Sequence, residues 1–169
     1  MLPRLAPLVL LLAAPAAAQV RLVETGIVCP RIVTGEMRPA PDTEFGEIRQ
    51  IDQPVIFDLD ARTVPTMTNL GFGFRIGLEA GQPARDVTIV VTHPPMGPRA
   101  VTRQSWSDRL EPGEDSVDLF TFEEDYEKVP GRWTFSVEID GSVVVEAPFD
   151  VVAEGGHGPV EDACFQFMS

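Results

Sequence analysis

One segment, residues 129–152, constrains the fold more than any other part of the chain, because its turn residues and its side-chain alternation agree. Asp140-Gly141 favours a type I′ turn, whose twist matches that of the two strands it joins. Pro130-Gly131 suits a type II turn, after which a strand can begin. The segment therefore predicts a β-hairpin.

Alternation gives the first strand of this hairpin one apolar face, formed by Trp133, Phe135, Val137 and Ile139. We predict that the indole of Trp133 is buried against a facing sheet, and that Trp106 lies nearer an edge. Pro148 has no backbone N–H to donate to a ladder, so it predicts a bulge or an edge in the second strand.

Residues 71–79 have the cleanest alternation elsewhere, with four apolar side chains on one face and glycines on the other. The glycines allow another backbone or a bulky side chain to approach closely. We expect further short strands at 19–28, 47–51, 54–60, 86–92, 99–106 and 116–123. The strand at 86–92 should stop at His93-Pro94-Pro95, and the rest of 30–50 should be an irregular connection.

Short strands separated by turns predict an all-β, immunoglobulin-like β-sandwich of about seven to eight strands. The antibody pattern of two cysteines around a core tryptophan is absent, so the likeness concerns architecture alone. No run of ten or more residues has helical periodicity, and any helix should therefore be short.

The first 18 residues have the pattern of a secretory signal peptide. Arg4 is the positive region, residues 8–14 form the apolar region, and the alanines at 16–18 suit the peptidase. We expect cleavage before Gln19, export to the periplasm or the medium, and no membrane insertion. Removing 18 of the 169 residues leaves 151, which suits a single domain over 19–169.

The chain is acidic, with 26 Asp and Glu against 13 Lys and Arg and a formal net charge of −13. This charge disfavours nucleic acid and anionic lipid as partners and favours cationic ones. Acidic residues concentrate in 111–127, which we interpret as a solvated face and loop.

The two cysteines, Cys29 and Cys164, lie near the ends of the mature chain. In an exported protein we expect them to form a disulfide rather than to remain two free thiols or to bind a metal, for which no CxxC spacing is present. Closing so long a loop contributes about 5 kcal/mol on the chain-entropy model.

Three blocks of sequence together resemble one family: TVPTMTNLGFGFRIGLEAG at 63–81, VTHPP at 91–95, and YEKVPGRWTFSVEIDGSVVVEAPFDVV at 126–152. The family is an uncharacterised group of exported bacterial proteins named domain of unknown function 3859. The resemblance implies an exported β-sandwich, and it provides no activity, ligand or catalytic residue. Residues 154–169, with Cys164, lie outside the resemblance.

Nucleophilic catalysis has little basis in this sequence, and we assign no catalytic residue and no cofactor. The mature chain has only His93 and His157 as bases for a triad, and it has no GxSxG elbow. Hydrolysis of carbohydrates by a pair of carboxylates remains a hypothesis, because the distance between two carboxylates depends on the fold and not on the sequence alone.

Copper is the sharpest metal hypothesis, because His93 and Met96 place an imidazole and a thioether close together in sequence. Further ligands would come from Met37, Met67, Met168 and His157. The histidines are far apart and the methionines form no cluster, so we expect turn and core roles and assign no metal site. Calcium at Asp58 and Asp60, or at 111–127, lacks the spacing of a calcium loop.

Three functions therefore remain: a non-enzymatic periplasmic module that binds a protein or another envelope component through loops or an edge strand, a copper-binding protein, and a small hydrolase.

Overall fold

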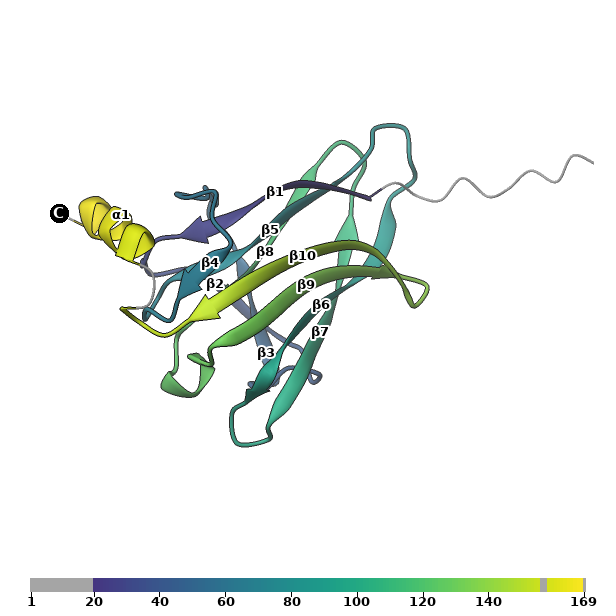
Figure 1. Cartoon of the computed structure of the whole chain (residues 1–169). Coiled ribbons are helices and arrows are strands. Elements are labelled where there is room, and N and C mark those ends of the chain that lie inside the picture. The colour runs from purple at the N-terminus through teal and green to yellow at the C-terminus, as the bar shows by residue number, and fades with distance from the viewer. Residues whose placement is uncertain (1–19, 156–157, 169) are drawn as a thin grey trace, which may run out of the picture.

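The computed structural model describes residues 20–155 and 158–168. Within these residues the chain forms two main sheets, a separate two-stranded ribbon and one α-helix (Figure 1). The predicted signal peptide and its cleavage site before Gln19 lie outside the described residues.

The two main sheets contain eight strands and form the sandwich. The three-stranded sheet has the order β1 (Val20–Val28), β5 (Gly71–Leu78), β8 (Asp115–Thr121). The five-stranded sheet has the order β4 (Thr63–Pro65), β10 (Ser142–Val152), β9 (Gly131–Ile139), β6 (Arg85–Met96), β7 (Val101–Leu110). The ribbon pairs β2 (Gly35–Pro39) with β3 (Glu47–Ile51), a 3-10 turn spans Asp125–Glu127, and α1 spans Gly158–Met168. The predicted all-β sandwich is confirmed.

The core lies between the two main sheets. The four alternating side chains of β5, Phe72, Phe74, Ile76 and Leu78, are fully buried, and so are Trp133, Phe135 and Val137 of β9. The Phe72 ring is 5.6 Å from those of both Trp133 and Phe135, measured between centroids. The inward face predicted for the hairpin strand is therefore confirmed, and Trp106 lies on the edge strand β7 with part of its surface exposed.

Glycines bring β8 close to β5, as the sequence predicted. A Cβ atom added at Gly73 would lie 2.0 Å from the carbonyl oxygen of Asp118, and one at Gly77 would lie 2.3 Å from the side chain of Asp115. A side chain at Gly73 would push the β8 backbone away, whereas one at Gly77 would displace the carboxylate of Asp115 and not the backbone, so Gly73 fixes the close approach of this edge strand.

The β9–β10 hairpin is confirmed. Asp140 and Gly141 have φ values of 51° and 77°, as a type I′ turn requires. The bulge in β10 lies between Val143 and Val145. Pro148 of β10 pairs with Thr134 of β9 on one side. On its other side the strand β4 pairs only with residues 150–152, so Pro148 lies at an edge, as predicted.

Two expectations about the strands were wrong. Residues 54–60 form no strand: Ile56 is exposed, and Leu59 makes a single bridge with Ile27. The short strand β4 follows instead, because Val64 is buried beside β10. In addition, β6 continues past His93 to Met96, where the ladder with β7 shifts and the two prolines need no ladder hydrogen bond.

The connection at 30–50 also differs from expectation, whereas the C-terminal segment forms a short helix, the length expected of any helix in this chain. Residues 35–39 pair with the predicted strand 47–51, so most of this connection is a β-ribbon. At the C-terminus, α1 has eleven residues and places Val160 and Cys164, four apart, on one buried face. Among the described residues, no helix has the length and apolar character needed to cross a membrane.

The predicted disulfide is confirmed. Cys29, directly after β1, is bonded to Cys164 of α1 across a sequence separation of 135 residues, and both residues are buried. The bond holds the C-terminal helix against the end of the sandwich where β1 finishes.

Candidate functional site

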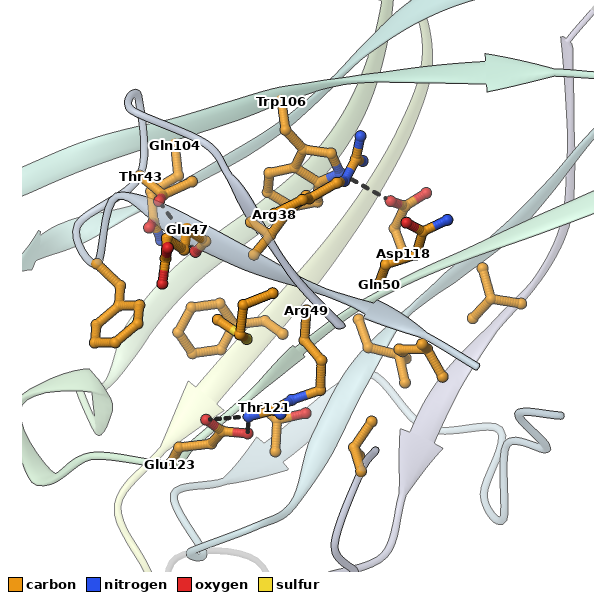
Figure 2. Close-up of a pocket in the computed structure, with 18 of the residues that line it drawn as sticks. Arg38, Thr43, Glu47, Arg49, Gln50, Gln104, Trp106, Asp118, Thr121 and Glu123 are labelled. Atoms are coloured by element: carbon orange, nitrogen blue, oxygen red, sulfur yellow. Dashed lines mark hydrogen bonds and ion pairs between the residues drawn. The ribbon is translucent and has the colours of Figure 1, made fainter. Parts of the chain in front are cut away.

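A pocket of about 780 Å³ lies between the ribbon and the open side of the sandwich (Figure 2). Its volume is in the range of ligand-binding pockets. Every residue of 47–51 on β3 and of 115–121 on β8 lines it. Because successive side chains of a strand point to opposite faces, a pocket lined by consecutive residues lies along the strand's edge. The backbone edges of β3 and β8 therefore face this pocket.

Polar contacts at its ends hold the ribbon over the pocket. Arg38 of β2 donates to the carbonyl oxygen of Ser107 at 3.1 Å, and Arg49 of β3 donates to both carboxylate oxygens of Glu123 at 3.1 and 3.2 Å. The buried core cluster has no member in β2 or β3 within the described chain. The ribbon thus covers the pocket without being part of the core.

Asp118 of β8 is the most unusual side chain in the pocket. It pairs with Phe74 across the sheet, and its carboxylate consequently points inward between the two sheets. The Trp106 indole nitrogen donates to Oδ1 at 3.1 Å, whereas Oδ2 is buried and has no hydrogen-bond partner among the described residues. Figure 2 shows Arg38 extending toward this pair from the ribbon.

The charge of Asp118 is poorly compensated. Its pKa is raised to about 7, mainly by burial and also by the charge of the neighbouring Asp108, against the lowering effects of the Trp106 hydrogen bond and the charge of Arg38. The Nε of Arg38 is also buried, without a hydrogen-bond partner in residues 20–155 and 158–168. A carboxylate and a guanidinium therefore lie near each other with unused hydrogen-bonding capacity on both.

The interpretation of 111–127 as a solvated face was wrong for part of the segment. Asp118 is buried, and Glu127 accepts from the backbone N–H groups of Glu123 and Glu124 at 2.7 and 2.8 Å, which closes the 3-10 turn. The sequence contains a signal for Asp118, because it has the same strand parity as Phe120 and Phe122, two members of the aromatic core. The partners Arg38 and Trp106 come from other sheets, and no local pattern reveals them.

His93 is a hydrogen-bonded core residue. Its ring stacks on Trp133 with centroids 4.5 Å apart, and its Nδ1 lies 2.8 Å from the carbonyl oxygen of Pro94, to which it donates. Nε2 then accepts from the Gln104 amide at 3.1 Å, while the other side of that amide accepts from the Glu44 backbone at 2.9 Å. Burial lowers the pKa of His93, against the raising effects of the Pro94 hydrogen bond and the Glu44 charge.

The candidate copper ligands are distributed over several places. Met96 and Met67 are buried in the core, and Met37 lines the pocket from β2. His157 and the side chain of Met168 lie outside the described part of the chain. The described residues contain no group of three or more His, Cys, Asp or Glu side chains placed to hold a metal ion.

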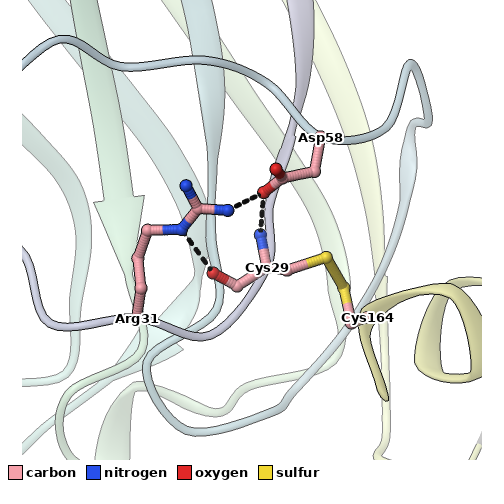
Figure 3. The surroundings of a disulfide bond; sticks show 4 residues. All are labelled: Cys29, Arg31, Asp58 and Cys164. Carbon is pink, nitrogen blue, oxygen red and sulfur yellow. Dashed lines mark hydrogen bonds and ion pairs between the residues drawn. A yellow bond between two sulfur atoms is a disulfide. The ribbon is translucent and has the colours of Figure 1, made fainter. Parts of the chain in front are cut away.

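Asp58, one of the residues considered as a calcium ligand, instead bonds to residues beside the disulfide (Figure 3). Its Oδ2 accepts from the backbone N–H of Cys29 at 2.8 Å and forms an ion pair with Arg31, which in turn donates to the Cys29 carbonyl oxygen at 3.2 Å. Asp60 is exposed.

Comparison with known proteins identifies the family and no activity. No curated protein matches the chain. A crystal structure of an immunoglobulin-like protein from Pseudomonas aeruginosa is similar with 22% identity and a TM-score of 0.49, covering 81% of this chain and 99% of that one. The model of the domain of unknown function DUF3859 matches residues 16–151, which include the whole pocket and exclude Cys164. The chain therefore belongs to the DUF3859 family, as its three sequence blocks indicated.

Proposed function

We propose that the protein is a non-enzymatic binding module of the periplasm, and that its pocket takes an extended segment of a partner protein as an added strand. The observation that carries this proposal is the edge of β8. All seven of its residues line the pocket, and among the described strands β8 pairs with β5 alone. An unpaired strand edge facing a pocket is the geometry used when a peptide adds to a sheet.

The edge is open along its length. Within the described residues, the side of β8 that faces away from β5 receives no backbone hydrogen bond from another strand or loop. Proteins usually block such edges, since they pair readily with other chains. Here the ribbon lies opposite the edge and leaves the pocket between them, so the site is both available and shielded from indiscriminate pairing.

The charge around the pocket favours a basic segment. Eight of its lining residues are acidic and three are basic. The acidic ones are Glu44, Glu47, Asp108, Asp115, Asp118, Glu123, Glu124 and Glu127, and the basic ones are Arg38, Arg49 and Arg75. This imbalance attracts a cationic partner and increases its rate of association.

The periplasm is proposed from two features: the signal-peptide pattern of residues 1–18 and the pairing of both cysteines. Disulfides persist in exported proteins and are rare in the cytosol. Intact mass of the protein from a periplasmic extract tests this, and a product that retains residues 1–18 would contradict it.

The strand-addition proposal is tested with the peptide KVKVKVKV and the same peptide N-methylated at alternate backbone amides. Methylation removes ladder donors and keeps the charge, so we expect it to weaken binding by about tenfold or more. Binding of the unmethylated peptide should also slow amide hydrogen exchange in β8, while the other edge strand β1 serves as an internal control. Equal affinities for the two peptides, unchanged exchange in β8, or no binding at millimolar peptide would each overturn the proposal.

A further inference from the structure

We propose that the bound segment carries a basic side chain opposite Asp118, and that this side chain enters the sandwich to pair with the free carboxylate oxygen beside Trp106. This inference rests on the proposed function, because it assumes that the segment lies along β8.

Strand geometry determines which side chain of the segment reaches the carboxylate. Residues directly opposite each other on paired strands have their Cβ atoms about 4.5–5.5 Å apart and on the same face. Asp118 points to the inner face, so the partner residue across from it points inward too. Two positions along, the next inward side chain lies beside Phe120, which is half-buried. The site therefore selects a basic residue and an apolar residue two positions apart.

The carboxylate is held ready for a ligand. Trp106 fixes one oxygen through its indole N–H at 3.1 Å, and only 9% of the surface of Asp118 is exposed, so the orientation of the group is defined. The other oxygen has no hydrogen-bond partner in the part of the chain that the structure describes. A buried acceptor without a donor is costly, and a guanidinium or ammonium group supplies the missing donor together with the opposite charge. The half-buried ring of Trp106 adds an aromatic surface next to that cation.

Arg38 is the neighbour that an incoming cation has to displace. Within the described chain its guanidinium makes one hydrogen bond, to the Ser107 carbonyl, and its Nε has none. Displacing Arg38 therefore breaks only its hydrogen bond to Ser107. No hydrogen bond to Asp118 is lost, because Arg38 makes none. Removing the Arg38 charge should therefore strengthen binding of a basic segment, and removing the Asp118 charge should weaken it.

The test compares the peptides KVKVKRKV and KVKVKXKV, where X is citrulline, which has the shape of arginine without its charge. On the wild-type protein we expect the arginine peptide to bind about tenfold more tightly. Asp118→Asn keeps the acceptor for Trp106, and it should reduce the ratio of the two affinities to below about twofold. Arg38→Gln should increase the ratio. Urea unfolding confirms that both variants are folded.

The outcomes separate this inference from the proposed function. If KVKVKVKV binds and N-methylation weakens it, but arginine and citrulline peptides bind equally, strand addition stands and the basic subsite is wrong. The basic subsite is equally wrong if Asp118→Asn leaves the ratio of affinities unchanged. If the acidic peptide EVEVEVEV binds better than KVKVKVKV, then Arg38 is the recognition group and the proposal is overturned. Loss of N-methylation sensitivity would instead remove the proposed function itself.

Discussion

Asp118 combines burial, one hydrogen bond and two neighbouring charges, Asp108 on β7 and Arg38 on β2. Its pKa is about 7 in the folded protein against an ordinary value of 3.8, so between these pH values the unfolded chain binds fewer protons than the folded one. Stability therefore falls as pH rises from 3.8 to 7, and the size of this contribution is about 4 kcal/mol.

We expect Asp118→Asn to remove this pH dependence. The free energy of unfolding of the variant, measured relative to that of wild type, should increase by a few kcal/mol from pH 4 to pH 8. The upper limit of this increase is about 4 kcal/mol, the whole contribution of the raised pKa. Urea unfolding of both proteins at pH 4, 6 and 8 measures the difference. A difference that stays constant over this range would contradict the raised pKa of Asp118.

The two tryptophans differ in their expected contribution to stability. Trp133 is fully buried, with ring centroids 4.8 Å from Phe120 and 4.5 Å from His93, so Trp133→Ala should cost about 3–5 kcal/mol through lost transfer energy and a cavity. Trp106→Ala should cost less, because part of its ring is exposed at the pocket, but it should weaken peptide binding. Urea unfolding of both variants tests the order, and a milder effect of Trp133→Ala would contradict the assigned register of β9.

At the scale of elements, α1 depends on one covalent bond and few buried side chains. Val160 and Cys164 are its side chains with less than a tenth of their surface exposed among those described. Cys29→Ser should lower the free energy of unfolding by about 2–5 kcal/mol without abolishing the fold, since the core between the sheets is intact. The melting temperature of the variant, compared with wild type under reducing and oxidising conditions, checks this. If the variant had the same melting temperature as the oxidised wild type, the disulfide would contribute nothing to stability.

Strands with one face on the core were predictable, because their apolar residues recur at every second position of the sequence. Residues 71–79 and the hairpin at 131–152 are of this kind. The ribbon was predictable only in part, since β2 has no buried residue and ends at Pro39. Its place over the pocket depends on contacts such as Arg49 with Glu123, which are 74 residues apart in sequence. The candidate site was missed for the same reason: its members come from separate sheets.

Considered as a whole molecule, the protein has one core shared by two sheets and a ribbon attached outside it. The aromatic cluster extends across both sheets, from Phe72 and Phe120 to Trp133 and Phe149. The two sheets should therefore unfold together as one cooperative unit. The ribbon contributes no side chain to the core cluster within the described residues, and its long-range side-chain contacts are largely exposed ion pairs and hydrogen bonds.

This difference predicts that the ribbon opens without the sandwich unfolding. Exposed ion pairs contribute about 0–1 kcal/mol each, far less than burial of the aromatic core. In native-state hydrogen exchange, the paired amides of β2 and β3 should open with a lower free energy than those of β5 and β9, and with little dependence on denaturant. Arg49→Gln breaks the contact with Glu123 and should speed exchange in the ribbon while leaving β5 unchanged. If ribbon amides instead followed those of β5 in both free energy and denaturant dependence, the ribbon would belong to the cooperative core.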